Sequence, residues 1–351
     1  MISKLIELIE ADCDQILLES YGLLKPIQNQ HILITGGTGF IGTWIAELVS
    51  YLNKNYNFNT RLTLLARNAD AILIKPTSLG RQKNIILKSK DVRNIIDLDS
   101  DINYIIHAAA NPDNREHSTN PLRVIDTIVH GTSALLEKST LLGGLNKILN
   151  ISSGMVYGSQ PHELNSIPET YIGKVDCSQI NSIYAESKRM GETICAAYRT
   201  QHRLEIVNAR PFAFIGPYQL IEKPWAINNF IRDSLMGGPI RILGNGDTVR
   251  SYMYGSEMAF WMLRILISGK SGHNYNVGSP HPISLKDLAL KVSNNFSPLP
   301  AILSRNGAES DATHSKFIPN VDIAKKDLGL EIKIDVDDAL RKTIEWNKLL
   351  V

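Results

Sequence analysis

A short apolar segment that leads into evenly spaced glycines constrains the fold of this chain more than any other feature. His31–Thr35 is a run of apolar residues typical of a buried strand, and Gly36, Gly39 and Gly42 follow it directly. The helical pattern of Trp44–Tyr51 begins just after the turn. A strand, a glycine turn and a helix in this order start a βαβ unit, and the helix N-terminus there offers amide donors to an anion. The motif therefore predicts a parallel sheet with a pyrophosphate site, and a tight turn that binds nothing is the alternative.

Strand-like and helical segments alternate along most of the chain. Beyond the first strand, we expect strands at 61–65, 85–87, 104–107, 147–151, 205–208 and 275–277, with helical stretches such as 124–142 between them. This alternation predicts an α/β fold with a Rossmann-type, doubly wound parallel sheet. We expect three parts: an N-terminal helical extension (1–28), a dinucleotide-binding Rossmann domain (29–215) to which 250–280 partly returns, and a smaller C-terminal substrate-binding lobe (216–351).

Residues 2–18 carry apolar side chains at helical spacing and predict an amphipathic helix ahead of the main domain. The apolar positions are Ile2, Leu5, Ile6, Ile9, Cys13, Ile16 and Leu17. We expect this helix to pack on the sheet domain. A helix that binds a partner or a membrane surface is the alternative, although the polar face here is acidic rather than basic.

Charge and composition argue against several classes of function. The chain has 37 basic and 35 acidic residues, a net charge of +2, and no long basic tract, so nucleic acid is not an expected partner. Its longest apolar stretch, 259–267, is broken by Arg264 and falls well short of the roughly 20 residues that span a membrane. The three cysteines are scattered, and the nine histidines lack metal-ligand spacing. We therefore expect a cytoplasmic protein with reduced thiols, no membrane partner and no metal.

The residues after the second and third expected strands bear on which dinucleotide is bound. An acid at the end of the second strand is typical of sites for NAD, but this chain has Ala66 followed by Arg67. Arg67 is suited to a 2′-phosphate, which favours NADP(H) over NAD(H), and a solvated arginine is the alternative. Asp91 and Val92 follow the third strand, where we expect them to meet the adenine ring or to cap a helix.

Tyr184 and Lys188 are four residues apart, which places them on one face of a helix. An ammonium beside a phenol lowers the pKa of that phenol, so the pair is suited to general acid/base catalysis near neutral pH. Ser153 follows the strand expected at 147–151, where a substrate hydroxyl would be held beside a cofactor. This tyrosine–lysine spacing often occurs by chance, but its position after the glycine turn favours a shared site.

These motifs together resemble the extended short-chain dehydrogenase/reductases, and more narrowly their nucleotide-sugar epimerase/dehydratase group. The matching segments, in chain order, are Thr35–Gly42, Lys90–Arg93, Ile106–Ala110, Gly131–Thr132, Ser152–Gly158, Tyr184–Lys188, Arg210–Pro217, Gly244–Gly246, Arg250–Tyr252, Tyr275–Gly278, Leu328–Gly329 and Trp346. The cofactor contacts that the resemblance implies are Gly36, Gly39, Phe40, Ile41, Gly42, Arg67, Asp91, Val92, Ala108, Ala109, Ala110, Tyr184, Lys188 and Pro211.

The resemblance also implies a reaction. Tyr184 would remove a proton from a sugar hydroxyl, usually at C4, while hydride passes to the nicotinamide, and Ser153 would hydrogen-bond the same oxygen. Lys188 would tune Tyr184 and hold the nicotinamide ribose. The implied substrate contacts are Ser153, Gly154, Met155 and Arg250, the last of these on the diphosphate. The family often forms homodimers through helices that correspond to 124–142 and 184–198, so a homodimer is expected.

Departures from the family pattern narrow the reaction. The 4,6-dehydratases carry an Asp–Glu pair where this chain has Gly154 and Met155, and the decarboxylases tend to carry a glutamate in place of Met155. Neither residue can carry a proton, so elimination of water is not expected. Ala213 and Ile128 stand where the family carries asparagines, so its usual phosphate contacts are not all expected here.

We therefore expect an NAD(P)-dependent enzyme that transfers hydride at C4 of a nucleotide-diphosphate hexose, as a 4-epimerase or a 4-keto reductase. Tyr184 is its expected general acid/base. A dehydratase or decarboxylase of the same family is the first alternative. A non-catalytic NAD(P)-binding regulatory protein and an NADP-linked reductase of small carbonyl compounds are alternatives of other kinds.

Overall fold

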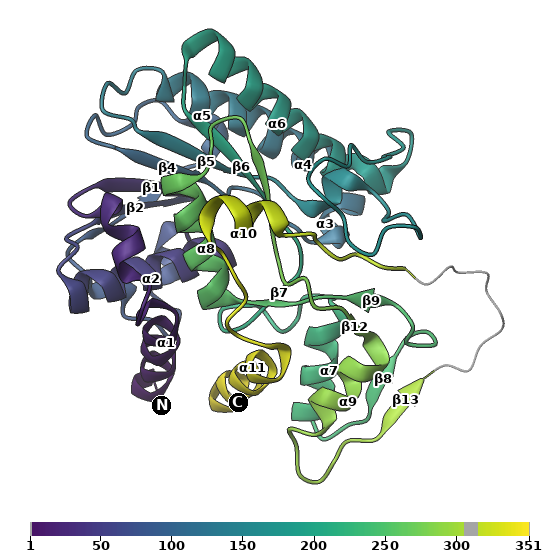
Figure 1. Cartoon of the computed structure of the whole chain (residues 1–351). Helices are drawn as coiled ribbons and strands as arrows, with labels where there is room; N and C mark the ends of the chain where they lie inside the picture. Colours follow the sequence, from purple (N-terminus) through teal and green to yellow (C-terminus); the bar gives the residue numbers. More distant parts are fainter. Residues whose placement is uncertain (1, 305–314, 351) are drawn as a thin grey trace.

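The computed structural model describes residues 2–304 and 315–350 and is built around a parallel sheet of seven strands (Figure 1). The strand order is β11-β6-β5-β4-β1-β2-β3, and every neighbouring pair is parallel. The strands are β1 (His31–Thr35), β2 (Arg61–Ala66), β3 (Ile85–Ser89), β4 (Tyr104–His107), β5 (Lys147–Ile151), β6 (Ile206–Pro211) and β11 (Asn274–Val277). The α/β, doubly wound fold that the sequence predicts is confirmed.

Helices cover both faces of this sheet because successive strand side chains point to opposite sides. In β1, Ile32 and Ile34 join the apolar cluster under one helical layer, and Leu33 joins the cluster on the other side. The first layer contains α2 (Phe40–Tyr56) and α8 (Gly255–Ser268), and the second contains α5 (Gly131–Ser139) and α6 (Ile183–His202). The buried strands therefore read as continuous apolar runs, as parallel strands with two covered faces do.

The segment between β4 and β5 differs from the single helix expected at 124–142. It forms α3 (Asn114–Thr119), α4 (Pro121–Ile125), a wide π-type turn η5 (Asp126–His130) and then α5. Thr132 Oγ1 donates to the Ile128 carbonyl oxygen, a bond of 2.5 Å beside the wide turn. Side-chain bonds to carbonyls four residues earlier often bend helices, and single π-type turns often mark functional sites.

A smaller set of elements lies beside the sheet domain, at the lower right of Figure 1. It contains the helices α7 (Ala226–Leu235) and α9 (Leu285–Ser293) and three short strand pairs. The pairs are β7 (Phe214–Ile215) with β10 (Met253–Tyr254), β9 (Val249–Arg250) with β12 (Ile283–Ser284), and β8 (Ile240–Ile242) with β13 (Ile302–Ser304). The described residues also form short 3-10 helices: η1 (Tyr21–Ile27), η2 (Ala69–Ile72), η3 (Leu79–Arg81), η4 (Val92–Asn94), η6 (Gly154–Tyr157) and η7 (Ile180–Ser182).

The N-terminal helix α1 (Ile2–Leu17) is part of the main core. It packs against α2, α8 and the C-terminal helix α11 (Val336–Leu350), while α10 (Asp322–Leu328) lies against α8 and β11. The buried carboxylate of Asp12 accepts hydrogen bonds from Tyr254 Oη at 2.6 Å and from Lys342 Nζ. The expectation that this helix packs on the sheet domain is therefore confirmed.

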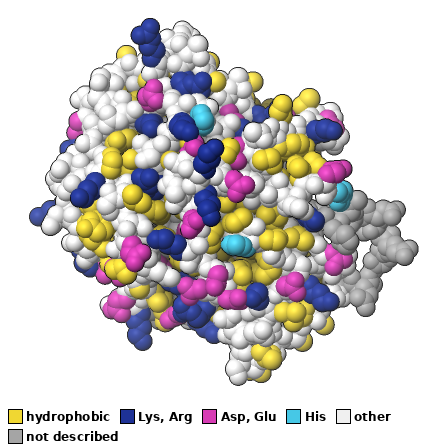
Figure 2. Space-filling model, viewed as in Figure 1, with side chains coloured by type: hydrophobic (Ala, Val, Ile, Leu, Met, Phe, Trp, Pro, Cys, Tyr) yellow, Lys and Arg dark blue, Asp and Glu magenta, His cyan; other side chains and the backbone are white. Residues whose placement is uncertain are grey.

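The surface carries charges of both signs. On the face drawn in Figure 2, Lys and Arg side chains are interspersed with Asp and Glu, and no field of one sign covers that face. Among residues 2–304 and 315–350, no helix combines the length and the apolar character needed to cross a bilayer.

Two substitutions on α1 test how much its packing stabilises the protein. Ile9 is 2% exposed, so Ile9→Ala should lower the free energy of unfolding by about 2–5 kcal/mol. Ile2 is 62% exposed on the same helix, and Ile2→Ala should change that free energy by less than about 0.5 kcal/mol. Urea unfolding followed by circular dichroism measures both values. Equal values for the two variants would contradict the packing role.

Candidate functional site

The largest collection of candidate site residues surrounds a cavity of about 600 Å³ at the carboxyl ends of β1, β2 and β4. Eight of the residues expected at a cofactor line it: Gly36, Gly39, Arg67, Asp91, Val92, Ala108, Ala109 and Ala110. The other lining residues include Thr38, Asn68, Lys90, Asn111, Glu116, Val124 and Ile128. Phe40, Ile41, Gly42, Tyr184, Lys188 and Pro211 are not among the lining residues, although Phe40–Gly42 open α2 beside the cavity.

Two glycines explain why the backbone can turn here. Gly36 has φ of +70°, and a Cβ atom there would meet the Ala108 carbonyl oxygen at 2.5 Å. A Cβ atom at Gly42 would meet the Gly37 oxygen at 2.7 Å. Glycine at this position therefore allows the first turn of α2 to pack directly against the glycine turn. The amide groups of the first turn of α2 are thus brought to the cavity with no side chain in between, which suits an anion.

The outer end of the cavity carries basic side chains. Arg67 is exposed beside it, and Lys90 lines the same end. Asp91 caps η4 by accepting from the backbone N–H of Arg93 at 3.0 Å, and it also pairs with the Arg93 guanidinium at 2.7 Å. The hydrogen bonds from Arg93 lower the pKa of Asp91 to about 2. Asp91 therefore caps a short helix, which is one of its two expected roles, and it also lines the cavity, while its contact with an adenine ring stays a prediction.

Ser153, Tyr184 and Lys188 are brought together beside the inner end of the cavity, and each is 7% exposed. Ser153 follows β5 and is hydrogen-bonded to the Tyr184 phenol. Lys188 Nζ donates to the Ile151 carbonyl oxygen at 2.6 Å and lies 5.8 Å from the centre of the Tyr184 ring. Tyr184 packs against Val124 and Ile128, which line the cavity. A phenol, a hydroxyl and an ammonium therefore meet beside the cavity.

Burial dominates the titration of this group. It raises the pKa of Tyr184 to about 12, against the effect of the hydrogen bond with Ser153. It also lowers the pKa of Lys188 to about 8, against the attraction of Glu192. The expectation that Lys188 lowers the phenol pKa is wrong for this arrangement, because the cost of burying a phenolate outweighs an ammonium 5.8 Å from the ring centre.

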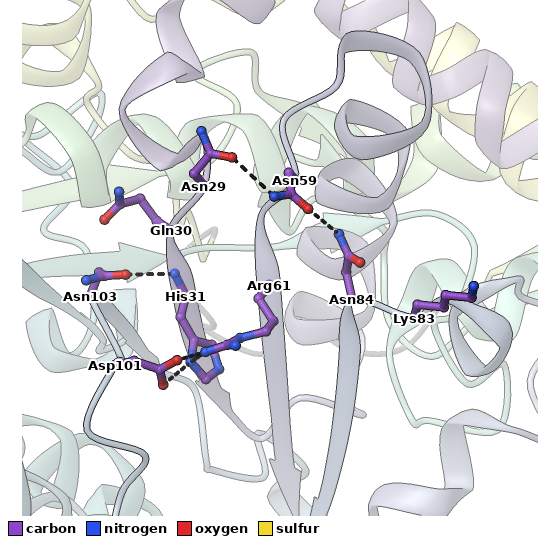
Figure 3. A pocket seen from close by; sticks show the side chains of 9 residues that line it. All are labelled: Asn29, Gln30, His31, Asn59, Arg61, Lys83, Asn84, Asp101 and Asn103. Atoms are coloured by element: carbon purple, nitrogen blue, oxygen red, sulfur yellow. Dashed lines mark hydrogen bonds and ion pairs between the residues drawn. The ribbon is translucent and has the colours of Figure 1, made fainter.

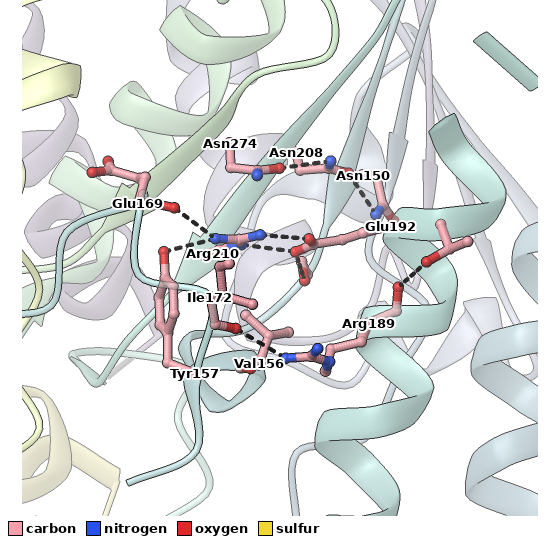
Figure 4. Close-up of polar contacts among 12 residues, drawn as sticks. Asn150, Val156, Tyr157, Glu169, Ile172, Arg189, Glu192, Asn208, Arg210 and Asn274 are labelled. Carbon is pink, nitrogen blue, oxygen red and sulfur yellow. Dashed lines mark hydrogen bonds and ion pairs between the residues drawn. The ribbon is translucent and has the colours of Figure 1, made fainter. Parts of the chain in front are cut away.

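A buried ion pair fixes α6 against the sheet (Figure 4). Glu192, one turn after Lys188, pairs with Arg210 of β6 at 2.6 Å and 2.9 Å, and the hydroxyl of Ser152 donates to the same carboxylate. Arg210 also donates to Tyr157 Oη at 2.9 Å. Breaking a buried pair of this kind by removing one partner costs about 3–5 kcal/mol. The pair therefore holds the helix that carries Tyr184 against β6, and Ser152 connects the same carboxylate to the segment that leads into Ser153.

Sequence reasoning missed two further groups beside the site. The imidazole of His117, on α3, is stacked on the Tyr184 ring with 4.5 Å between ring centres and 10° between planes. Phe212 fills the space where a Cβ atom on Gly154 would be, at 2.9 Å from its Cε2 atom. Both contacts join segments far apart in the chain, and no local pattern signals them.

The expected substrate residues come from two parts of the fold: Ser153, Gly154 and Met155 follow β5, and Arg250 lies on β9 of the smaller set of elements. Met155 is 41% exposed, and Gly154 is buried under Phe212. Arg250, on β9, donates to the carbonyl oxygens of Val249 and Ser315 at 2.8 Å and 2.9 Å. Burial lowers the pKa of Arg250, and no carboxylate pairs with it among the described residues. Its charge is therefore not neutralised by the described part of the chain.

A second pocket, of about 430 Å³, lies at the opposite, amino edge of the sheet (Figure 3). Its polar groups are engaged with one another: Arg61 pairs with Asp101, and the His31 ring lies 2.9 Å from Asp101 and 2.8 Å from Thr63. Burial lowers the pKa of His31 to about 4, so its ring is neutral at pH 7. This edge lacks the helix N-terminus and the bare turn of the first cavity, which we take as the candidate site.

Comparison with known families and proteins agrees with this geometry. The sequence model of the NAD dependent epimerase/dehydratase family matches residues 32–278. UDP-glucuronic acid decarboxylase 4 of Arabidopsis thaliana is 28% identical over 318 residues, which cover 88% of this chain and 66% of that protein. The chain thus spans slightly less than two-thirds of the length of this relative.

Solved structures share the fold. The UDP-glucose 4-epimerase of Thermotoga maritima, crystallised with UDP-glucose, superposes with a TM-score of 0.75 at 22% identity, over 92% of this chain and 100% of that one. The Bordetella bronchiseptica enzyme WbmF, in complex with NAD+ and UDP, gives a TM-score of 0.71 at 22% identity, over 93% and 94% of the two chains. At these identities the superpositions show a common fold alone.

A substitution at the turn tests the role of the bare backbone. Gly36→Ala combines a positive φ with a clash on Ala108, so it should lower the free energy of unfolding by at least about 1–2 kcal/mol and weaken binding of NADH and NADPH. A Cβ atom at Gly143 would meet nothing within 4 Å, so Gly143→Ala should leave both properties unchanged. Urea unfolding and fluorescence titration with the two dinucleotides measure these effects. Normal binding by the Gly36 variant would argue against a dinucleotide at this turn.

Proposed function

The chain belongs to the NAD dependent epimerase/dehydratase family, and from that membership we propose that it transfers hydride at C4 of a nucleotide-diphosphate hexose. The two forms of this reaction that the site supports best are 4-epimerisation and reduction of a 4-keto sugar. The observation that carries the proposal is the meeting of Ser153, Tyr184 and Lys188, each nearly buried, beside the cavity formed by the glycine turn.

The residues of the chain would handle the proton of this reaction. In the direction of oxidation, Tyr184 Oη accepts the proton that leaves the C4 hydroxyl, and Ser153 Oγ hydrogen-bonds the same oxygen. In the direction of reduction, Tyr184 Oη returns a proton to the oxygen at C4. The buried ammonium of Lys188 is suited to donate to a ribose hydroxyl. The nicotinamide, when bound, accepts and returns the hydride.

The cavity fits a dinucleotide. Gly36 leaves bare backbone beside Ala108, and the N-terminus of α2 opens on the same cavity, which suits a pyrophosphate. Arg67 and Lys90 at the outer end favour the 2′-phosphate of NADP(H). WbmF, a structural neighbour, was crystallised with NAD+ instead. The proposed preference for NADP(H) therefore rests on Arg67 and Lys90.

The substrate tail would lie on the smaller lobe. Arg250 keeps an unneutralised positive charge among the described residues, which suits a diphosphate. The T. maritima epimerase was crystallised with UDP-glucose, and WbmF was crystallised with UDP. These two complexes support sugars linked to uridine diphosphate as the first substrates to test.

Decarboxylation of a nucleotide-linked uronic acid is the second candidate. Its support is the similarity to UDP-glucuronic acid decarboxylase 4. Met155, in place of the glutamate that resemblance to the decarboxylases would require, argues against it. Incubation with UDP-glucuronic acid separates the two candidates, because a decarboxylase releases CO2 and a product lighter by that mass.

We further propose a homodimer in the cytoplasm. The helices α4 and α6 expose apolar side chains, with Leu122 79% exposed and Met190 49% exposed, and a second copy is suited to cover them. All three cysteines are free thiols, as they are in a reducing compartment.

Removal of one hydroxyl tests the proposed general acid/base. Tyr184→Phe should lower turnover of the active nucleotide sugar by about 10²–10⁴-fold and leave the melting temperature nearly unchanged. Tyr198 lies on the same helix, and its hydroxyl contacts only the Ser133 carbonyl oxygen, at 3.5 Å, so Tyr198→Phe is the matched control. The assay follows UDP-, dTDP-, GDP- and CDP-hexoses and their 4-keto forms by NMR. Undiminished turnover in the Tyr184 variant would refute the mechanism.

Loss of the guanidinium at position 67 tests the choice of cofactor. A charge-assisted hydrogen bond is worth about 1.5–3 kcal/mol, so Arg67→Ala should weaken NADPH binding roughly 10- to 100-fold. NADH lacks the 2′-phosphate and serves as the internal control, with an unchanged Kd. Equal changes in Kd for the two dinucleotides would contradict the proposed preference for NADP(H).

A further inference from the structure

We propose that His117 is a positioning residue that holds the ring of Tyr184 in its reactive place and ties that ring to the smaller lobe. The role rests on the proposed function, in which Tyr184 is the general acid/base. The two rings are stacked with 4.5 Å between centres and 10° between planes. His117 is 5% exposed and Tyr184 7% exposed, so the stack is nearly closed to solvent. A flat ring against the phenol opposes any swing of its plane.

The imidazole is itself held in one orientation. His117 Nε2 lies 2.8 Å from the Asn111 carbonyl oxygen. A carbonyl oxygen only accepts, so Nε2 carries the proton of this bond. Asn111 lies at the cavity, and its side-chain oxygen accepts from the backbone N–H of Asp113 at 3.2 Å. The imidazole is thus tied to the segment that lines the site.

An ion pair then joins this segment to the smaller lobe. Asp113 caps α3 by accepting from the backbone N–H of Arg115 at 3.0 Å, and its other oxygen accepts from Lys223 Nζ at 2.9 Å. Lys223 lies in the connection between β7 and α7. The side chains of Asp113 and Lys223 are 7% and 21% exposed. A continuous set of contacts therefore runs from Lys223 through α3 to His117 and Tyr184.

The remaining neighbours of Tyr184 do not replace the stack. Val124, Ile128, Ala110 and Ile183 pack around the ring with apolar surface, and the Lys188 ammonium lies 5.8 Å from the ring centre; none of these offers a second flat ring. Ser153 interacts with the hydroxyl, at the far end of the phenol, and a contact there does not define the plane of the ring. The imidazole is thus the flat partner that defines the plane of the phenol. Small errors in the placement of a reacting group are costly, since about 1 Å can lower a rate 10²-fold.

Two substitutions of His117 separate the stack from the hydrogen bond. His117→Phe keeps a flat ring and loses the donor to Asn111, whereas His117→Gln keeps an amide donor and loses the ring. Crystal structures of the full-length variants show the ring of Tyr184 directly, without any substrate. We expect the ring to keep its plane in the Phe variant and to turn or become disordered in the Gln variant.

Kinetics provide a second readout once an active nucleotide sugar is in hand. His117→Gln should lower kcat about 10- to 100-fold with KM within about twofold, and His117→Phe should restore kcat to within about threefold. Lys223→Met should lower kcat roughly two- to fivefold, the range that a partly exposed ion pair supports. Lys270 pairs with Asp327 at the same 2.9 Å, away from the site, so Lys270→Met is the matched control and should leave kcat unchanged.

The outcomes separate this role from the proposed function. An undisturbed Tyr184 ring in the Gln variant would overturn the positioning role, and so would a Phe variant as impaired as the Gln variant. If no nucleotide sugar is turned over and the ring still moves in the Gln variant alone, the proposed function fails while the positioning of Tyr184 stands.

Discussion

The common direction of the seven strands is the constraint on which the rest of the site depends. Parallel pairing aligns Thr35 with His107, and His107 with Asn150, so β1, β4 and β5 all end at one edge of the sheet. Gly36, Ala108 and Ser153 follow those ends, and they are among the residues that we propose to contact a ligand. A ligand crevice forms at such an edge because loops and helix N-termini from several strands converge there. An antiparallel neighbour would have sent one of these ends to the opposite edge.

Rigidity at this edge comes from buried polar contacts rather than from the loops themselves. Arg210 and Glu192 join β6 to α6, and Ser152 joins β5 to the same carboxylate. Tyr184 and Lys188, the proposed catalytic pair on α6, are therefore placed by groups that do not line the cavity. The same logic applies on the other side of Tyr184, where His117 is stacked on the phenol and bonded to the chain at Asn111. Contacts on two sides therefore hold the phenol: the sheet acts on it through α6, and α3 contacts the ring directly through His117.

The sequence predicted those features that local patterns encode. The glycine turn, the alternation of strands and helices and the four-residue spacing of Tyr184 and Lys188 are all signals within a few residues, and the structure has the turn, the parallel sheet and the shared helix face. The wide turn at Asp126–His130, the stack of His117 on Tyr184 and the place of Phe212 against Gly154 depend on contacts between distant segments. The direction of the phenol pKa was misjudged for the same reason, because the burial that raises it is set by the whole fold.

The side chains beside the inner end of the cavity, those around Ser153 and Tyr184, limit which reactions we propose for the site. Elimination of water needs both an acid and a base, but the residues after Ser153 are Gly154, covered by Phe212, and Met155. A hydride transfer at C4 needs only one proton to leave and return, which a single phenol can carry with a hydroxyl beside it. Oxidation at C4 of a hexuronic acid creates a β-keto acid, which loses CO2 without a further base. Decarboxylation therefore needs no acid–base pair of the kind that dehydration needs, although the decarboxylases tend to carry a glutamate at the position of Met155, and for that reason we place it second to an epimerase or a reductase.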